Sequence, residues 1–344
     1  MAVKSKTGVL LVNLGTPDAP TYGAVYRYLK QFLLDKRVID IPWLPRQLLV
    51  RGIIVPFRSR ATSKLYKKLW LEDGSPLMIY GTQLTEGVQQ LLGDDYVVEL
   101  AMRYQNPSIE SAVDRMLSQP ISNVIVVPLF PQYASASTGS AHEEVMRVFS
   151  KQQTIPDIKF INSFYDYEPM IDVFIENARK YDLERYDHIL FSYHGLPERQ
   201  LKKADTCNHC LKVENCCQTI SEKNQFCYSA QCHATTYALA EKLNLPKEKY
   251  SICFQSRLGN DPWVQPYTTD VLKERAAAGD KRLLVFCPAF VADCLETTVE
   301  VLDEYQEEWE EMGGEHLDLV ESLNAHPKWI EAVKDLVVKN EPVF

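Results

Sequence analysis

The sequence contains no apolar run that approaches the roughly 20 residues that an α-helix needs to cross a bilayer. Its N-terminus also lacks the long apolar region of a signal peptide, because the run Val9–Val12 is only as long as a strand. An excess of positive charge is missing too: the formal net charge is −9, which argues against general nucleic-acid binding. We therefore expect a cytoplasmic protein, or one that binds peripherally to the inner face of a membrane.

A disulfide framework is not expected either, although the chain has nine cysteines, because disulfides are rare in cytoplasmic proteins. Cys253 and Cys287 lie within strand-like runs and are most simply explained as small core residues. Six of the nine cysteines, however, fall between Cys207 and Cys232. This concentration needs its own explanation.

The chain has 344 residues, of which 46% are hydrophobic, and this length suits two α/β domains. Strand-like runs alternate with stretches of helical length, which predicts parallel sheets with helices on both faces. The strand-like runs are Gly8–Asn13, Tyr96–Met102, Asn123–Phe130, Ile158–Ser163, His188–Tyr193, Tyr250–Gln255, Arg282–Cys287 and His316–Val320. We predict two similar doubly wound (Rossmann-like) halves, each with a four-stranded parallel sheet flanked by helices, and an active cleft between them.

The divide between the halves falls near Phe164–Tyr167, and the halves share no clear sequence repeat. We expect an N-terminal α/β domain over residues 1–165 and a C-terminal α/β domain over residues 166–325. Residues 326–344 would add a C-terminal helix, Pro327–Lys339, that packs back on the first half.

Residues 26–71, called the lip below, are apolar but contain no good strand, and so long an excursion is more often functional than a plain connection. Much of Leu29–Leu34 is best explained as ordinary helix core. An exposed apolar rim in the rest would mark a ligand or membrane site. Basic residues within the lip would suit anionic lipid head groups or substrate carboxylates. They are Lys36, Arg37, Arg46, Arg51, Arg58 and Arg60.

The stretch Asp187–Arg199 places a histidine where α/β proteins bind their ligands. Ile189–Tyr193 is typical of a buried strand, and Pro197 ends it because proline has no backbone donor. Ligands bind at the carboxyl ends of parallel strands, and His194 lies at such an end. Because histidine titrates near neutral pH, His194 is a candidate proton acceptor. The alternative is a histidine that only caps the loop.

A second stretch repeats this plan after the strand-like run Arg282–Cys287 and a proline turn. Asp293, Glu296 and Glu300 follow at steps of three and four, which would place them on one face of a helix. A solvated acidic face is the simpler explanation for Glu307–Glu311. It is less natural for Asp293 and Glu296, because they follow directly after a buried strand.

These motifs resemble those of the ferrochelatases, which insert ferrous iron into a porphyrin to make haem. The resemblance covers nearly the whole chain and rests on several long motifs in the same order. They are Val12–Pro17, Asp73–Pro76, Ala101–Tyr104, Pro128–Ser140, Ser192–Arg199, Gln255–Arg257, Asp261–Trp263 and Pro288–Thr297. The resemblance implies a lyase that inserts Fe²⁺ into protoporphyrin IX to give protohaem, the terminal step of haem biosynthesis.

The resemblance also implies roles for the acidic and histidine residues. His194 would remove the pyrrole protons, and Glu296 would orient it, receive protons or hand over iron, so that both residues meet the substrate metal. Asp293 and Glu300 would extend the acidic line outward as a path for protons or for a hard cation. The sequence departs from a common family pattern at Cys294, where many relatives have a second histidine. This puts in doubt any iron-delivery role of that side chain.

The porphyrin propionates need a cation, and Arg103 directly follows a predicted strand. Ser135, Ser137 and Thr138 offer hydroxyls in a Gly/Ser loop; this loop lacks the P-loop lysine pattern, so nucleotide binding is the weaker alternative. Four aromatic residues are candidates to contact the macrocycle, with a core position as the equal alternative. They are Tyr66, Tyr104, Trp263 and Phe290.

The cysteine-rich excursion, residues 205–232, predicts a thiolate-bound centre. Cys207 and Cys210 form a C-x-x-C pair, and Cys216, Cys217 and Cys227 follow within a short distance. On spacing alone, four of these five cysteines suit zinc and an iron–sulfur cluster equally, and the spacing does not decide between the adjacent Cys216 and Cys217. The resemblance favours a [2Fe–2S] cluster, because some ferrochelatases carry one, with zinc as the alternative. Cys232 is expected to be structural.

Two other functions compete with this prediction. A coproporphyrin III ferrochelatase, or a cobalt chelatase acting on a sirohydrochlorin, would call for more basic residues around its substrate. A non-catalytic haem or iron–sulfur binding protein would not require both His194 and Glu296. The expected partners are protoporphyrin IX, ferrous iron and a membrane at the lip, with no nucleic acid, and the chain is expected to be a monomer or a homodimer.

Overall fold

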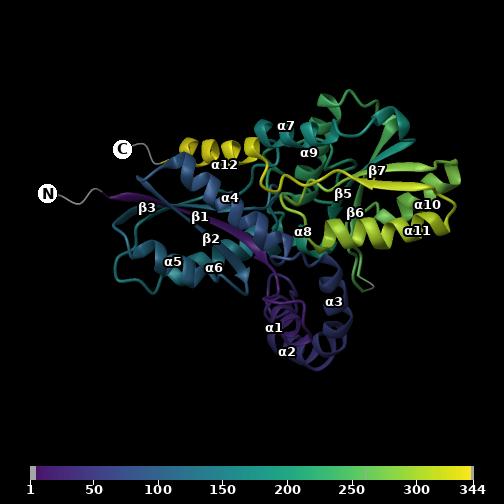
Figure 1. Cartoon of the computed structure of the whole chain (residues 1–344). Helices are drawn as coiled ribbons and strands as arrows, with labels where there is room; N and C mark the ends of the chain where they lie inside the picture. The colour runs from purple at the N-terminus through teal and green to yellow at the C-terminus, as the bar shows by residue number, and fades with distance from the viewer. Residues whose placement is uncertain (1–4, 260, 342–344) are drawn as a thin grey trace. The chain divides into compact units, whose positions relative to one another are not determined.

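The computed structural model describes residues 5–259 and 261–341; the outermost residues of the predicted first domain and of the C-terminal segment lie outside this range. The chain divides into two compact units (Figure 1). The first comprises Met1–Phe130, Ser135–Ser163 and Asn324–Phe344, and the second comprises Pro131–Ala134 and Phe164–Leu323.

The first unit contains a four-stranded sheet with all strands parallel, in the order β2-β1-β3-β4. Residues Val9–Val12 in the central strand β1 are fully buried, as expected for a strand with helices on both faces. The elements are β1 (Lys6–Gly15), α1 (Tyr22–Leu33), α2 (Trp43–Leu49), η1 (Val50–Ile54), α3 (Val55–Leu69), α4 (Pro76–Leu92), β2 (Tyr96–Tyr104), α5 (Ile109–Leu117), β3 (Ile121–Pro128), η2 (Ser135–Gly139), α6 (Ser140–Phe149), β4 (Asp157–Phe160) and α12 (Pro327–Lys339).

The second unit repeats this topology with the strand order β6-β5-β7-β8, again all parallel. Its elements are α7 (Glu168–Ala178), η3 (Leu183–Arg185), β5 (His188–His194), α8 (Glu198–Ala204), α9 (Tyr228–Lys242), η4 (Lys247–Lys249), β6 (Tyr250–Gln255), α10 (Thr268–Ala278), β7 (Arg282–Phe286), η5 (Leu295–Tyr305), α11 (Gln306–Glu311) and β8 (His316–Leu319). The prediction of two similar four-stranded parallel halves is confirmed.

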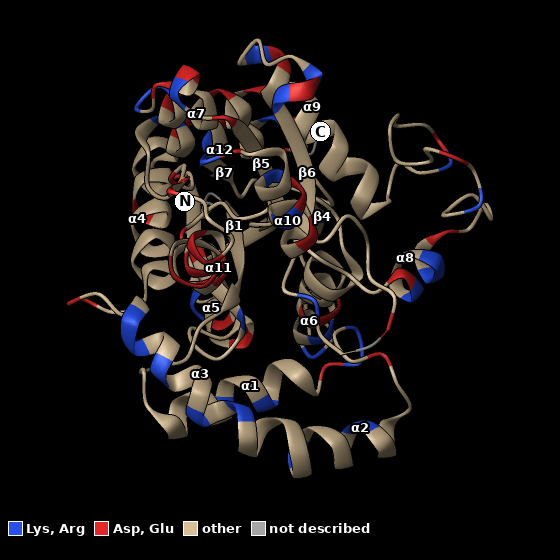
Figure 2. Cartoon of the chain, turned by 90° about the vertical axis from the view of Figure 1, so that its right-hand side faces the viewer, with Lys and Arg blue, Asp and Glu red and all other residues tan. Residues whose placement is uncertain are grey.

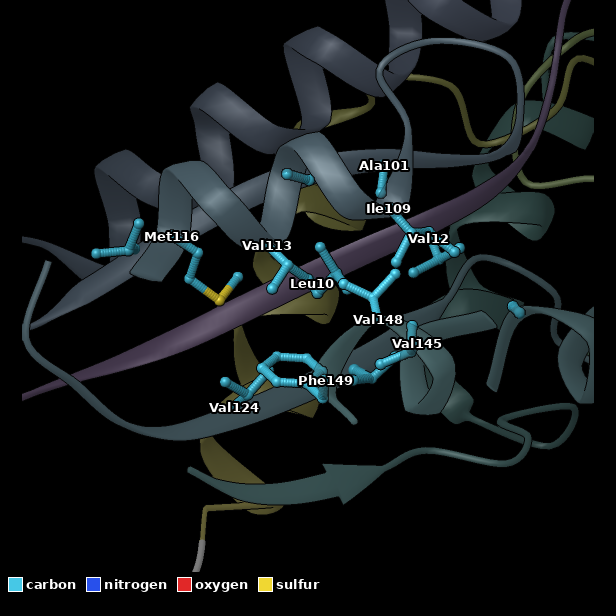
Figure 3. Packing of buried hydrophobic residues seen from close by; sticks show 14 residues of the cluster. Leu10, Val12, Ala101, Ile109, Val113, Met116, Val124, Val145, Val148 and Phe149 are labelled. Carbon is cyan, nitrogen blue, oxygen red and sulfur yellow. The ribbon is translucent and has the colours of Figure 1, made fainter. Parts of the chain in front are cut away.

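Helices α5 and α6 cover one face of the first sheet (Figure 3). Leu10 and Val12 are two residues apart in β1, so their side chains point to the same face of the sheet. Met116 of α5 and Phe149 of α6 belong to the buried cluster that these two residues form. The strand period therefore determines which residues of β1 meet these helices.

Helix α4 packs against the sheet through Leu100 of β2, and it also contacts α12. A Cβ atom added to Gly81 would lie 3.1 Å from Leu100 Cδ2, and one added to Gly87 would lie 2.7 Å from Ile330 Cδ1. The absence of side chains at these two glycines thus allows α4 to approach both the sheet and α12. The C-terminal helix belongs to the first unit as a result of the second contact.

The lip forms helices α1, α2, η1 and α3, and α1 packs against α3 (Figures 1 and 2). Leu29 and Leu33 of α1 are buried, and the rings of Tyr28 and Tyr66 meet edge to face with centroids 6.2 Å apart. In the described part of the chain, no helix is long and apolar enough to cross a membrane.

Candidate active site

The candidate active site begins where β5 ends, at His194, which is paired in register with Gln255 of β6. A Cβ atom on the following residue, Gly195, would lie 2.8 Å from the carbonyl oxygen of Gln255 and 3.1 Å from Cε3 of Trp263. The close approach of the chain at this turn therefore requires glycine. The Tyr228 hydroxyl donates to the carbonyl oxygen of His194 at 2.9 Å. The backbone that carries the imidazole is thus held by two neighbouring elements.

The hydrogen bond of the His194 ring determines its neutral tautomer. Nδ1 lies 2.7 Å from the carbonyl oxygen of Gly195, and a carbonyl oxygen only accepts, so Nδ1 carries the proton. Nε2 is then left with the lone pair. Because the side chain is partly exposed, a neutral His194 can act as a general base through Nε2.

The acidic candidates Glu296 and Glu300 belong to a π-helix, η5, which begins at Leu295. Glu296 lies in its first turn and Glu300 lies four residues later, and both side chains are partly exposed. A π-helix has wider turns than an α-helix, with hydrogen bonds from residue i to residue i+5, and such turns are frequent at functional sites.

Asp293 does not share a helix face with Glu296, so this part of the sequence prediction is wrong. The residue between Asp293 and the helix, Cys294, is extended (φ −151°, ψ −170°), and the helix begins only after it. Asp293 Oδ1 instead accepts hydrogen bonds from the Thr297 hydroxyl and the backbone N–H of Ser322, both at 3.3 Å. Asp293 therefore ties the start of the helix to the segment after β8.

Glu300 is surrounded by donors. Ser256 Oγ lies 2.7 Å and 3.0 Å from its two carboxylate oxygens, Gln255 Nε2 donates at 3.1 Å and the Tyr305 hydroxyl donates at 3.0 Å. Burial and, after it, the charge of Glu300 raise the pKa of Tyr305, so the phenol remains protonated and continues to donate. The carboxylate of Glu300 therefore anchors the helix to the end of β6.

Two groups restrain Glu296. Gln255 Nε2 donates to its carbonyl oxygen at 2.7 Å, and the Cys294 thiol forms a hydrogen bond with its carboxylate. Burial and the negative charge of Glu296 raise the pKa of Cys294 well above the ordinary thiol value. Cys294 is therefore a neutral donor at physiological pH, and its thiol holds the carboxylate of Glu296 in place.

Arg103 is not the uncommitted cation that the sequence suggested. Its Nη2 lies 2.7 Å from Asp35 Oδ2, and its Nε donates to the Ser140 hydroxyl at 2.7 Å. The side chains of Arg103 and Asp35 are only 15% and 6% exposed. The Ser140 hydroxyl and the Tyr104 hydroxyl also donate to Asp35, at 2.5 Å and 3.0 Å. This network joins the end of β2, the start of α6 and the segment after α1.

The aromatic candidates occupy different environments. Tyr104 is completely buried against Phe32, with ring centroids 5.2 Å apart, so it cannot contact a macrocycle in this structure, and burial raises the pKa of its phenol. Tyr66 and Trp263 are also buried, the former against Tyr28 and the latter over the His194 turn. Phe290 is only partly buried and remains a candidate for porphyrin contact.

The Gly/Ser loop after β3 is a π-helical turn, η2, that continues into α6. Ser135 and Ser137 are partly exposed, whereas Thr138 is buried. The Ser135 hydroxyl accepts a hydrogen bond from Arg37 Nη1 at 2.8 Å, and the same guanidinium pairs with Glu143 at 2.5 Å. Ser135 and Ser137 thus remain available at the end of this strand, whereas the charge of Arg37 is already paired.

Asp205 organises the start of the cysteine-rich excursion. Its carboxylate accepts hydrogen bonds from the backbone N–H groups of Cys207 at 2.9 Å, His209 at 2.7 Å and Cys210 at 2.8 Å. The resulting turn buries Cys210 but leaves Cys207 exposed. The two members of the C-x-x-C pair are therefore not equivalent.

Four of the five candidate thiols form a continuous chain of contacts. Cys216 Sγ lies 3.6 Å from Cys217 Sγ, Cys217 donates to Cys227, and Cys227 donates to Cys210. The hydrogen bond from Cys227 lowers the pKa of Cys210, and donation to Cys210 raises the pKa of Cys227 to about 11. The Sγ of Cys207 lies instead 3.7 Å from the Thr206 hydroxyl.

These thiols are arranged as a chain and not around one point. Over residues 5–259 and 261–341, no three His, Cys, Asp or Glu side chains form a group that could hold a single metal ion. Cys232 lies inside α9, which begins at Tyr228, and is completely buried. It therefore has the surroundings of a core residue.

Known proteins resemble this chain over its whole length. The ferrochelatase family profile matches residues 6–341. A ferrochelatase of Coxiella burnetii (strain Dugway 5J108-111) is 45% identical over 347 residues, which cover 100% of this chain and 97% of the relative. A ferrochelatase of Legionella pneumophila (strain Lens) is 43% identical over 332 residues, which cover 96% of this chain and 98% of the relative. This chain belongs to the ferrochelatase family.

Two solved structures share the fold with a TM-score of 0.55: SirB from Bacillus subtilis with Fe³⁺, and the sirohydrochlorin chelatase SirB from Bacillus subtilis subspecies spizizenii in complex with cobalt. They are 14% and 13% identical to this chain. Each match covers 97% of this chain and 95% of the solved chain. At such identities the likeness concerns the fold alone. Membership of the ferrochelatase family makes the protein a metal chelatase of haem and porphyrin biosynthesis, with ferrous iron and a porphyrin as substrates.

Three residues that organise this ferrochelatase site received no role in the sequence analysis. Gln255 had a detectable signal, because it is a polar residue that ends an apolar strand at the ligand-binding edge of a sheet. Tyr228 and Asp35 had none, since their contacts with His194 and Arg103 join segments that are far apart in the chain.

The pairing of Arg103 with Asp35 predicts a loss of stability when either partner is removed. Arg103→Met and Asp35→Asn should each lower the free energy of unfolding by about 3 kcal/mol, because the remaining buried charge loses its partner. The double variant should lose less than the sum of the two. Urea denaturation measures these values, with Lys151→Met as control, because its pair with Glu110 is exposed. Normal stability of Arg103→Met with a raised KM for porphyrin would instead assign this arginine directly to the substrate.

Proposed function

We propose that this protein is a ferrochelatase, a lyase that inserts Fe²⁺ into protoporphyrin IX and gives protohaem, the last step of haem biosynthesis. The observation that carries the proposal is the hydrogen bond between His194 Nδ1 and the Gly195 carbonyl, which directs Nε2 of the neutral ring to act as the base at the carboxyl end of β5. A carboxylate, Glu296, begins the helix that follows the neighbouring strand β7. A base and a hard anionic ligand are the two groups that metal insertion requires.

The reaction releases two pyrrole protons while Fe²⁺ exchanges its other ligands for four ring nitrogens, with no change in oxidation state. His194 accepts a pyrrole proton at Nε2, and its Nδ1–H remains bonded to the Gly195 carbonyl as the imidazolium forms. Glu296 receives a proton or hands over the iron, and the Cys294 thiol donates a hydrogen bond to its carboxylate. Asp293 and Glu300 continue the path for protons or for the cation.

Two observations support protoporphyrin, with two propionates, over coproporphyrin III, which has four. The charges of three basic residues near the η2 turn are mostly offset, since Lys36 and Arg37 share Glu143 and Arg103 meets Asp35. The lip also presents apolar side chains that suit vinyl groups. Ser135, Ser137 and Phe290 remain the proposed porphyrin contacts, and Arg103 supports the two serines from the Asp35 network.

Anaerobic incubation with Fe²⁺ and each porphyrin, followed at the Soret band, tests the function. We expect insertion into protoporphyrin IX with the higher kcat/KM. His194→Ala and Glu296→Gln should bind porphyrin but lose at least about a hundredfold in kcat, because each removes a group that acts in the reaction. The control is Glu307→Gln, on the exposed acidic stretch, which should stay within about twofold. Equal losses in Glu296→Gln and Glu307→Gln would contradict the assignment.

We further propose that the lip binds the surface of an anionic membrane. Five large apolar side chains are exposed on α2, η1 and α3, with Trp43 at 66% and Phe57 at 76%. The four lip helices contain nine Lys and Arg residues and no Asp or Glu, although the chain as a whole has a net charge of −9 (Figure 2). Apolar insertion together with basic residues is how peripheral segments bind anionic lipid. Arg46 does not take part, because it is buried and donates to the carbonyls of Ile39 and Ile41.

Vesicle sedimentation tests this surface. The double variant Trp43→Ser, Phe57→Ser should reduce the partition onto phosphatidylglycerol vesicles by at least about tenfold, because both side chains lose apolar area that would enter the interface. Ile155→Ser, at an exposed apolar residue outside the lip, is the matched control and should bind as the wild type does. If both variants partition equally onto phosphatidylglycerol vesicles, the lip is not the membrane site. If the wild type binds neutral phosphatidylcholine vesicles as well as phosphatidylglycerol vesicles, the lip does not select anionic lipid.

For the cysteine-rich excursion we propose a [2Fe–2S] cluster held by Cys210, Cys216, Cys217 and Cys227. The support is their chain of sulfur contacts, from which Cys207 is absent. A cluster has two irons that share four thiolates, so its ligands need not converge on one point. When bound, the cluster would supply redox-active iron and a cross-link of the excursion. The excursion carries none of the residues that act on the porphyrin.

Cysteine variants purified anaerobically test the ligand set. The wild type should be reddish-brown, with about two irons and two acid-labile sulfides per chain. Cys217→Ser should be colourless and less stable, because it breaks the middle of the sulfur chain. Cys207→Ser and Cys253→Ser, outside that chain, should keep the colour. Stoichiometric zinc without sulfide would mean a different metal, and a colourless Cys207→Ser would return that residue to the ligand set.

A further inference from the structure

We propose that Gln255 is a positioning residue that sets the place of Glu296 relative to His194. The proposal rests on the roles proposed above for these two residues. Gln255 is the last residue of β6, is 1% exposed and lies beside His194 in the sheet register. Its surroundings contain no room for solvent, so every polar atom of its side chain must find a partner within the protein.

The orientation of the Gln255 amide is determined by its neighbours. The Ser192 hydroxyl donates to Oε1 at 2.7 Å. Nε2 lies 2.7 Å from the carbonyl oxygen of Glu296 and 3.1 Å from a carboxylate oxygen of Glu300, both of which only accept. A flipped amide would bring oxygen against two oxygens. The side chain therefore has one satisfied orientation, which joins β5 to the first turn of η5.

The backbone of Gln255 completes the connection. Its carbonyl oxygen accepts the N–H of Gly195 at 2.8 Å, and the Gly195 carbonyl in turn holds Nδ1 of His194. The main chain of Gln255 thus bonds to the turn that carries the imidazole of His194. The side chain of Gln255 bonds to the turn that carries Glu296. A displacement of about 1 Å between reacting groups can cost as much as 10²-fold in rate. Gln255 is placed to prevent such a displacement.

Gln255→Met tests this role, because methionine keeps the volume and removes the three hydrogen bonds of the amide, with Ser192, Glu296 and Glu300. We expect kcat for Fe²⁺ insertion to fall at least about tenfold while the KM for porphyrin stays within about twofold, because the walls of the substrate site are unchanged. The matched control is Tyr305→Phe, which removes a donor to Glu300 but not the bond to the Glu296 carbonyl. Its kcat should remain within about twofold of the wild type.

Gln255→Glu adds a readout that a purely structural role would not change. The ionised carboxylate cannot donate to Glu296, whereas the protonated carboxyl can, so the ratio of its kcat to that of the wild type should rise as the pH falls. Ser192→Ala keeps the amide but frees its oxygen, and we expect a smaller loss in kcat. These two variants decide the question if Gln255→Met does not fold.

An unchanged kcat in folded Gln255→Met, or a kcat ratio for Gln255→Glu that does not depend on pH, would overturn the proposal. A change confined to KM would overturn it as well, since it would assign Gln255 to substrate binding. Measuring iron insertion by the wild type distinguishes a failure of the positioning role from a failure of the proposed function. If the wild type inserts no iron into any porphyrin, the function is wrong, whereas an active wild type with equally active variants refutes only the positioning role.

Discussion

The structure depends on one constraint: a polar side chain along a central parallel strand cannot reach water. Strands β1 and β5 are hydrogen-bonded on both sides and covered on both faces, so their interiors are apolar. Polar side chains therefore gather at the carboxyl ends, and hydrogen bonds are needed to offset the desolvation of those that are buried there. This requirement links Ser192 to Gln255, and Gln255 to Glu296 and Glu300, in one connected network.

The two units have a π-helical segment at equivalent places in their topology. In each sheet the third strand in chain order, β3 or β7, is followed by a π-helical segment, η2 or η5. Both segments carry proposed site residues, hydroxyls in η2 and carboxylates in η5. A π-turn opens the helical backbone and leaves carbonyl groups available to other donors, as the Glu296 carbonyl is to Gln255. The common topology thus extends to the geometry of the site, although the sequences differ.

Charge is distributed so that few cations remain uncommitted around the proposed porphyrin contacts. Asp35 and Glu143 offset most of the positive charge near η2, whereas the lip helices keep basic residues without acidic ones. A buried pair such as Arg103–Asp35 contributes mainly through geometry, since desolvation offsets much of its attraction. Its network holds the start of α6 against β2, beside the turn that carries Ser135 and Ser137. Arg103 can therefore affect porphyrin binding without touching a propionate.

The sequence by itself determined the eight strands, the two similar halves and the turn at His194. These depend on local patterns, namely apolar runs of strand length and the proline Pro197 that stops the strand, which have the same meaning in any surroundings. It also indicated the candidate base and carboxylate, because both follow a buried strand. Only the tertiary structure decided that Asp293 lies before the helix, that Tyr104 is buried, that Arg103 is paired and that Cys207 is apart from the other thiols. The results for Asp293, Tyr104 and Arg103 depend on partners distant in the chain, such as Ser322 for Asp293 and Asp35 for Arg103, and no local pattern specifies which distant groups will meet.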